Sequence, residues 1–180
     1  MIDSLYNALV NSEYRGIVIE KFKKTNAMRL LETQKIEYEL LTYEVDENDL
    51  SGEHIANEIG FPYEQVFKTL VTIGKSGKYY VFMIPVAEEL DLKKAARCAG
   101  EKSIEMIKSK ELLPLTGYVH GGCSPIGMKK QFPTFVHESA AACPEIMFSA
   151  GKIGYQVELP LASLQKAVRL TLCDLIVAAN

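Results

Sequence analysis

Residues 121–127 read Gly-Gly-Cys-Ser-Pro-Ile-Gly. Glycine allows positive φ and close backbone approach, whereas proline fixes φ and removes a donor, so this segment fits neither a helix nor a central strand. It predicts a loop whose free N–H groups converge on one oxygen atom, as in a backbone nest. A second such loop, Ser149-Ala150-Gly151-Lys152-Ile153-Gly154, follows about one strand hairpin later. Together they predict a pocket with main-chain walls, which can stabilise an oxyanion without a catalytic triad or a metal.

Around these loops, strand and helix patterns are interleaved irregularly. Strand candidates are apolar segments rich in β-branched and aromatic residues, at 38–45, 66–73, 79–86, 103–107, 132–137, 146–149, 155–159 and 170–175. Helix candidates combine cap residues with apolar residues at helical spacing, at 5–10, 20–34, 51–60, 91–100, 108–113 and 161–168. This order does not suit a doubly wound sheet. It predicts an α+β (mixed α/β) fold in which one mixed sheet curls into a barrel-like core surrounded by helices.

The bulk properties exclude several classes of protein. The chain has 180 residues, 48% of them hydrophobic and 24% charged, which suits one globular domain. The net charge of −3 argues against a strong general nucleic-acid binder, and we expect no DNA partner. No apolar run has membrane-spanning length and no signal-peptide pattern opens the chain, so we expect no membrane contact. Four cysteines without paired spacing predict reduced thiols and a cytoplasmic protein.

Lys68 is the unusual charge in this sequence. It lies in Phe67-Lys68-Thr69-Leu70-Val71, an otherwise apolar and β-branched strand candidate. A buried ammonium is costly, so an inward-pointing Lys68 must serve something anionic. Strand alternation equally allows Lys68 to face solvent. Basic residues also cluster at 21–24, 93–94 and 129–130, and a solvated surface is the simplest interpretation of each cluster.

Two other kinds of site are conceivable from the sequence. His120, Cys123 and His137 suggest either a metal site or a Cys–His nucleophilic pair. A metal needs three or four converging ligands, and a fourth has no obvious candidate. A catalytic cysteine needs a base within reach. Tyr43 by itself reads as a strand residue whose hydroxyl lies at the rim of the core.

Six short motifs occur in a fixed order along the chain, and together they are far more specific than any one alone. They are Lys24-Thr25-Asn26-Ala27-Met28-Arg29, Phe67-Lys68-Thr69-Leu70, Leu90-Asp91-Leu92-Lys93-Lys94, Leu115-Thr116-Gly117-Tyr118, the first glycine loop followed by Met128-Lys129-Lys130, and Ser149-x-Gly151-Lys152. Over roughly residues 21–177 the chain resembles the YbaK/EbsC family of Cys-tRNA(Pro) deacylases, which is related to the editing domain of bacterial prolyl-tRNA synthetases.

The resemblance implies an editing domain over residues 21–180, preceded by an extension of unknown role at residues 1–20. It implies an enzyme acting in trans that removes cysteine wrongly attached to tRNA(Pro), classed as a hydrolase or a lyase. Such enzymes use no metal, no cofactor and no protein nucleophile, because the substrate's own thiol is thought to attack its ester. The implied partners are the 3′ end of mischarged tRNA(Pro) and, transiently, prolyl-tRNA synthetase.

The resemblance also assigns roles to residues. Lys68 would position the terminal adenosine, its phosphate or the ester, and backbone N–H groups of Gly121 and Gly122 would stabilise the oxyanion. Substrate-binding positions would be Tyr43, Ser124, Pro125, His137, Ser149 and Gly151. His137 departs from the family, which often has Asp or Asn there, and Ile153 stands where an arginine is usual. Two alternatives stay open: a deacylase for alanine or another small residue, and a non-catalytic module that binds an aminoacyl or nucleotide end.

Overall fold

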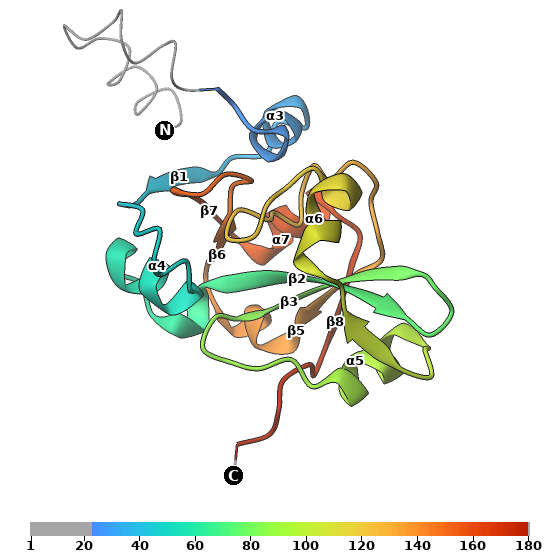
Figure 1. Ribbon diagram of the computed structural model, residues 1–180. Helices are drawn as coiled ribbons and strands as arrows, with labels where there is room; N and C mark the ends of the chain where they lie inside the picture. Colours follow the sequence, from blue (N-terminus) through green and yellow to red (C-terminus); the bar gives the residue numbers. More distant parts are fainter. Residues whose placement is uncertain (1–22, 180) are drawn as a thin grey trace, which may run out of the picture.

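The computed structural model describes residues 23–179 and shows the predicted α+β architecture (Figure 1). The helices are α3 (Asn26–Thr33), α4 (Gly52–Ile59), α5 (Leu92–Ala99), α6 (Ser109–Thr116) and α7 (Leu161–Ala167), with short 3₁₀ turns η1 (Tyr63–Gln65) and η2 (Glu138–Ala142). The strands are β1 (Glu39–Thr42), β2 (Phe67–Gly74), β3 (Tyr79–Pro85), β4 (Ile104–Met106), β5 (Thr134–His137), β6 (Ile146–Ser149), β7 (Tyr155–Leu159) and β8 (Leu170–Cys173). The predicted helix at 5–10 and the extension at 1–20 lie outside the described residues.

The strands of residues 23–179 form two sheets, so the predicted curling of one sheet into a barrel is not confirmed. One sheet has the order β4-β2-β3-β5-β8, with antiparallel pairs among β4, β2 and β3 and parallel pairs among β3, β5 and β8. The other is antiparallel, in the order β1-β7-β6. A single bridge between Val66 and Met147 links the start of β2 to β6. The two sheets are therefore linked at this point without continuous strand pairing.

Local signals set the helix boundaries. The Ser51 hydroxyl accepts the N–H of His54 at the start of α4, and Gly60 ends that helix with φ of 75°. Asp91 and Gly100 cap α5 in the same way, as predicted. The predicted helix at 20–34 begins only at Asn26 among the described residues, because Thr25 is extended and its hydroxyl accepts the N–H of Met28.

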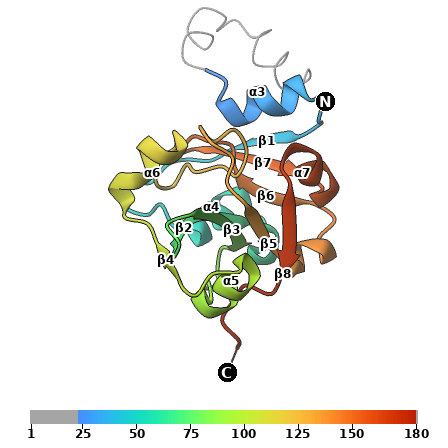
Figure 2. The ribbon, with the colours of Figure 1, turned by 90° about the vertical axis from the view of Figure 1, so that its right-hand side faces the viewer.

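Apolar residues fill both faces of the five-stranded sheet. One cluster lies between this sheet, the three-stranded sheet and helices α3 and α7, with Met28, Phe148 and Leu164 buried in it. A second cluster, containing Phe82 and Phe135 in a stacked pair, lies under α5. Figure 2 shows α3 above the three-stranded sheet and α5 at the opposite end of the molecule. The two clusters hold the five-stranded sheet between them. The candidate site lies at the start of β2 in this sheet.

Carboxylates meet across the three-stranded sheet, and they predict a pH effect on stability. Glu158 on β7 pairs in register with Glu39 and Met147. A hydrogen bond with Glu145, then burial, then the charges of Glu145 and Glu39 raise the pKa of Glu158 from 4.5 to about 7. Because the folded state binds this proton more tightly than the unfolded state, the stabilisation is full below about pH 4.5 and is lost as pH rises through 7.

We therefore expect Glu158→Gln, which cannot ionise, to raise the melting temperature by about 1–3 °C at pH 8 and by less at pH 5, since these side chains are partly exposed. Thermal unfolding at both pH values measures this. Glu58→Gln on the exposed side of α4 is the control. An equal change at both pH values would show that Glu158 does not hold a proton in the folded chain.

Candidate functional site

The two glycine loops touch through their backbones. A Cβ atom at Gly122 would lie 3.0 Å from the backbone nitrogen of Ile153, so only glycine fits there without displacing the second loop. Gly151 has φ of 95°, and a Cβ atom on it would come within 2.7 Å of the Tyr118 ring. The Tyr118 hydroxyl in turn donates to the carbonyl oxygen of Ile126 at 2.6 Å. Glycine is therefore required for close packing at these positions, and the loops form one compact unit.

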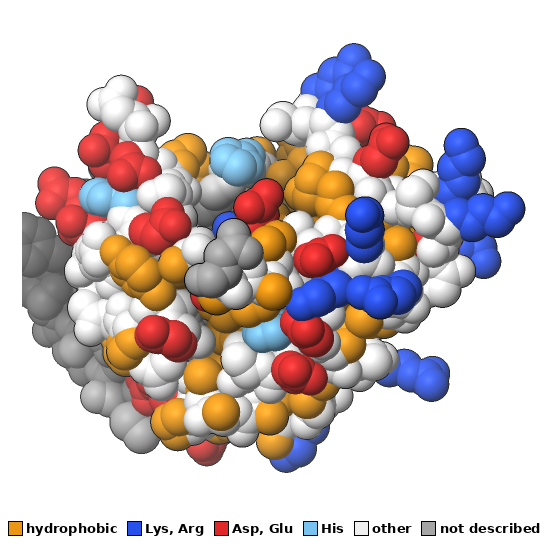
Figure 3. All heavy atoms as spheres, turned by 90° about the horizontal axis from the view of Figure 1, so that it is seen from below, with side chains coloured by type: hydrophobic (Ala, Val, Ile, Leu, Met, Phe, Trp, Pro, Cys, Tyr) orange, Lys and Arg blue, Asp and Glu red, His pale blue; other side chains and the backbone are white. Residues whose placement is uncertain are grey.

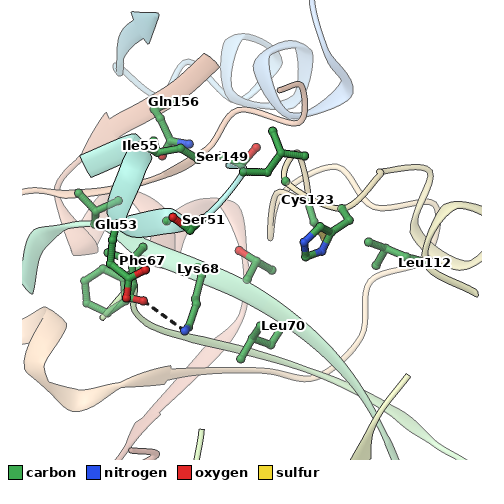
Figure 4. Close-up of a pocket in the computed structure, with 17 residues that line it drawn as sticks. Ser51, Glu53, Ile55, Phe67, Lys68, Leu70, Leu112, Cys123, Ser149 and Gln156 are labelled. Carbon is green, nitrogen blue, oxygen red and sulfur yellow. Dashed lines mark hydrogen bonds between the residues drawn. The ribbon is translucent and has the colours of Figure 1, made fainter. Parts of the chain in front are cut away.

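A pocket of about 500 Å³ opens beside this unit (Figure 4), a size within the usual range for small-molecule sites. It is bounded by the start of α4, the first half of β2, the beginning of the first glycine loop, and single residues of β6, β7, α6 and the segment after β3. The lining residues are Leu50, Ser51, Gly52, Glu53, Ile55, Val66, Phe67, Lys68, Thr69, Leu70, Val86, Leu112, His120, Gly121, Cys123, Ser149 and Gln156.

Lys68 lines this pocket and is half-buried. Its Nζ atom donates a hydrogen bond to the carbonyl oxygen of Val86 at 3.2 Å, and no carboxylate of residues 23–179 lies within 4.0 Å of it. Figure 4 shows the side chain extending from β2 between Glu53 and Leu70. Glu53 lines the same pocket but makes no ion pair with Lys68, so the Lys68 ammonium can still attract an anionic ligand.

Of the two predicted oxyanion donors, only Gly121 lines the pocket, with φ of 80°. Gly122 is buried behind it, and its N–H donates to the carbonyl oxygen of Val119 at 3.0 Å. That N–H group belongs to a turn inside the loop and is not free for a ligand. The expectation of two converging free N–H groups at 121 and 122 is thus not met in this conformation, because the tight turn consumes one of them.

The other predicted positions divide into three groups. Ser149 lines the pocket, and its hydroxyl oxygen accepts the N–H of Gly151 at 3.2 Å, which leaves the hydroxyl proton available. Ser124 and Pro125 are buried within the first loop, and the Ser124 hydroxyl oxygen accepts the N–H of Ile126. These two residues shape the loop and do not line the pocket. Gly151 acts in the same indirect way, through its contact with Tyr118.

Tyr43 and His137 lie outside the pocket lining. The Tyr43 hydroxyl is buried without a hydrogen-bond partner in the described part of the chain, and burial raises its pKa. His137 is buried at the end of β5, where its Nδ1 atom accepts the N–H of Leu175 at 3.1 Å and lies 3.9 Å from a carboxylate oxygen of Asp174. His137 therefore fastens the segment after β8 to the sheet.

The pocket also contains polar residues that the sequence patterns did not single out. Thr69 Oγ1 and Gln156 Oε1 are buried, and neither has a hydrogen-bond partner within residues 23–179. Figure 4 shows Gln156 beside Ser149, on the side of the pocket away from Leu70. Unpartnered buried oxygens are costly, so these two are candidates for contact with a ligand's donors. The available signal was a glutamine inside an apolar strand, which is weak without the fold.

Cys123 lines the pocket but is a poor nucleophile. Burial raises the pKa of its thiol to about 12, against a smaller opposite effect of a hydrogen bond with Thr116. A nucleophilic cysteine requires the thiolate, which is scarce at neutral pH for such a group. Residues 23–179 also contain no group of three or more His, Cys, Asp or Glu side chains arranged for a metal ion. No helix within that range has the length and apolar character to cross a membrane.

Comparisons with known proteins agree with this geometry. A profile of the aminoacyl-tRNA editing domain matches residues 47–167. The Enterococcus faecalis protein named "Putative Cys-tRNA(Pro)/Cys-tRNA(Cys) deacylase EbsC" is 48% identical over 137 residues, covering 76% of this chain and 84% of that protein. Every site position discussed above except Tyr43 lies within the profile match.

Solved structures share the fold. A crystal structure described as "a putative trans-editing enzyme for prolyl tRNA synthetase" superposes with a TM-score of 0.75 at 24% identity, covering 87% of this chain and all of that one. Another, described as "hypothetical protein APE2540", gives a TM-score of 0.77 at 18% identity, covering 85% of this chain and all of that one. At these identities the structures support the fold alone. The profile match and the Enterococcus relative establish that the chain belongs to the aminoacyl-tRNA editing domain family, and they confirm the resemblance to the YbaK/EbsC family drawn from its motifs.

Proposed function

We propose that this chain is a trans-editing aminoacyl-tRNA deacylase that removes cysteine wrongly attached to tRNA(Pro). The observation that carries the proposal is the Lys68 ammonium, which shares a pocket with Gly121 and Ser149 and has no carboxylate partner among the described residues. The 48% identical Enterococcus relative, named for deacylation of Cys-tRNA(Pro) and Cys-tRNA(Cys), supports the choice of substrate.

In this proposal the pocket holds the 3′-terminal aminoacyl adenosine. Lys68 attracts the negative charge of the terminal phosphate as a point charge and thereby places the ester. The N–H of Gly121 and the hydroxyl of Ser149 face the ester carbonyl, where oxyanion charge develops. The unpartnered Gln156 oxygen accepts a hydrogen bond from the substrate's ammonium group. An aminoacyl ester is already activated, so orientation and electrostatic stabilisation supply most of the acceleration.

The bond-breaking step uses the substrate's own sulfur. The cysteine thiol loses its proton to solvent and its sulfur attacks the ester carbonyl carbon, which forms a carbon–sulfur bond and a tetrahedral oxyanion. The bond between the carbonyl carbon and the 3′ oxygen then breaks, and the 3′ oxygen takes up a proton. The products are tRNA with a free 3′ hydroxyl and a cyclic thiolactone, which water later opens to cysteine.

A requirement for the substrate thiol gives discrimination that pocket size cannot give. Alanine and serine are no larger than cysteine, and a pocket rejects smaller side chains only weakly. A group that the reaction itself needs excludes them by chemistry. We further propose that the synthetase partner of the family, prolyl-tRNA synthetase, presents the mischarged tRNA in a transient complex.

Deacylation assays with purified Cys-tRNA(Pro), Ala-tRNA(Pro) and Ser-tRNA(Pro) test this proposal. We expect release of cysteine at least about 100-fold faster than release of alanine or serine, because only cysteine carries the nucleophile. Comparable release of alanine would establish the alternative small-residue deacylase. Binding of aminoacyl-tRNA without release of any amino acid would establish the non-catalytic alternative.

The Cys123→Ser variant separates the substrate's sulfur from the protein's sulfur. Since the Cys123 thiol is buried with a pKa near 12, we expect the variant to release cysteine within about threefold of the parent rate. Circular dichroism confirms its folding. A folded but inactive Cys123→Ser variant would instead make Cys123 the nucleophile and contradict the substrate-assisted step.

A further inference from the structure

The pocket lies between two lips of opposite charge. On one side, residues 44–53 lead into α4 and contribute Leu50, Ser51, Gly52 and Glu53 to the lining. We name this segment the acidic lip for its carboxylates, Glu44, Asp46, Glu47, Asp49 and Glu53. On the other side lie α6, which contributes Leu112, and the beginning of the first glycine loop, which contributes Gly121 and Cys123. The segment after that loop returns to the end of α6. We name this side the basic lip for its lysines, Lys108, Lys110, Lys129 and Lys130.

The lysines of the basic lip come from two segments that both adjoin α6. Lys108 and Lys110 flank the start of α6, a helix about 12 Å long. At the other end of α6, the N–H of Lys129 donates to the carbonyl oxygen of Thr116 at 3.0 Å. The Lys129 side chain also runs past Gly117, since a Cβ atom there would lie 3.4 Å from its Cγ atom. The lysines therefore lie at the two ends of α6, with Lys108 and Lys110 at its start and Lys129, followed by Lys130, at its end.

The positive charges of these four lysines are only partly balanced by neighbouring carboxylates. All four lysines are exposed, and none has a carboxylate within 4.0 Å among residues 23–179. Glu111 lies on the same helix and keeps its negative charge while its side chain accepts the backbone N–H of Lys108 at 2.8 Å. The four lysines still outnumber this carboxylate, so the basic lip is net positive at neutral pH.

The acidic lip has the opposite character. No lysine or arginine occurs between residues 36 and 67. The hydroxyl and backbone N–H of Ser51 hold the pKa of Asp49 below its usual value, so this carboxylate stays ionised at neutral pH. Figure 3 shows carboxylates on the left-hand side of one face of the molecule, over α4. Figure 4 places Glu53 and Leu112 at opposite sides of the pocket, with Lys68 between them.

We propose that the tRNA acceptor stem leaves the pocket across the basic lip, with its phosphates on Lys108, Lys110, Lys129 and Lys130, and is turned away from the acidic lip. This inference rests on the proposed function, because it takes the pocket to hold the aminoacyl 3′ end. An RNA backbone carries one charge per phosphate, so it gains from each lysine and is repelled by each carboxylate. The net charge of −3 does not oppose this, since the two lips separate the charges.

The test compares two substrates that differ only in the RNA they carry. The Lys108→Gln, Lys110→Gln, Lys129→Gln, Lys130→Gln quadruple variant is assayed on Cys-tRNA(Pro) and on 3′-O-cysteinyl adenosine, which has no acceptor stem. We expect the ratio of kcat/KM for the tRNA to that for the adenosine ester to fall about 10- to 100-fold. Because each duplex phosphate contact contributes about 0.9 to the slope of log kcat/KM against log salt concentration, the slope should flatten by about 3 to 4.

A matched control removes the same charge elsewhere. The control is a quadruple glutamine variant at Lys35, Lys93, Lys166 and Arg169, all exposed and none of them lining the pocket. It should keep the parent ratio and the parent salt slope. An equal loss in the control would reduce the effect to overall charge, and an unchanged ratio in the basic-lip variant would overturn the proposed path. A loss seen only when prolyl-tRNA synthetase is present would assign the basic lip to that protein and also overturn it.

Binding of uncharged tRNA(Pro), measured by fluorescence anisotropy, tests the basic lip separately from the proposed deacylase activity. If the parent chain cleaves neither substrate, the proposed function fails. The basic lip is still supported if the quadruple variant binds this tRNA about tenfold or more weakly than the control does, and it is overturned if they bind alike.

Discussion

The Lys68→Ala variant is expected to release cysteine from Cys-tRNA(Pro) about 100- to 1,000-fold more slowly than the parent chain. Lys68 brings the only ammonium among the pocket-lining residues, and no carboxylate of residues 23–179 lies within 4.0 Å of it. Its removal takes away the attraction that places the terminal phosphate, and a misplaced ester loses both orientation and oxyanion stabilisation. Single-turnover deacylation measures the effect on the bound substrate directly.

Two further variants keep this result interpretable. Lys68→Met retains most of the aliphatic stem without the charge and should be as inactive as Lys68→Ala, whereas a purely structural role would leave it active. Lys75→Ala removes an exposed ammonium from the turn at the far end of the same strand and should keep the parent rate. Parent-like rates in folded Lys68→Ala would remove Lys68 from the site and with it the main support for the proposed function.

The Gly127→Ala variant is expected to lose about 2–4 kcal/mol of unfolding free energy, or roughly 5–15 °C of melting temperature. Gly127 has φ of 75°, and a Cβ atom there would lie 2.8 Å from the backbone of both Asn26 and Ala27. Alanine would therefore suffer backbone strain and would also force the first glycine loop away from the start of α3. Chemical denaturation gives the free energy directly.

Gly77→Ala separates these two costs. Gly77 has a similar φ of 86°, but no atom lies within 4 Å of a Cβ built on it. It should lose only about 1 kcal/mol, the cost of the left-handed conformation alone. Equal losses in the two variants would show that the close approach of the loop to α3 has no energetic weight.

The parts of the fold that depend on neighbouring residues were predictable from the sequence. Ser51 with Gly60, and Asp91 with Gly100, bracket α4 and α5 because a cap acts within one turn of its own helix. The hairpin of β2 and β3 followed from two apolar segments around a glycine-containing turn. These signals need no knowledge of the rest of the chain.

The arrangement of the strands was not predictable in the same way. Whether β7 joins one continuous sheet or a separate sheet with β6 and β1 depends on its pairing with β1, which lies more than 100 residues earlier in the chain. Strand propensity is the same in both cases, since it reports a half-buried pleated surface and not its partner. The sequence therefore did not specify how the two sheets meet, which in the described residues is through the isolated Val66–Met147 bridge.

Some features of the candidate site were also predictable from the sequence, and others depend on the fold. A lysine inside an apolar strand and two glycine loops are visible in the sequence, and the structure brings Lys68, Gly121 and Ser149 to one pocket. The engagement of the Gly122 N–H by Val119 depends on the conformation of the turn, which composition does not specify. The place of Gln156 in the pocket depends on how β7 faces β2 across the two sheets.

The backbone contact between Gly122 and Ile153 bears on how new specificities could be engineered. Any side chain added at position 122 must push against the neighbouring main chain, so this wall cannot be remodelled one substitution at a time. Other parts of the lining are built from ordinary side chains, including Ile55, Leu70 and Leu112. A mutant library that seeks acceptance of bulkier amino acids should therefore randomise those three positions and leave the glycines untouched.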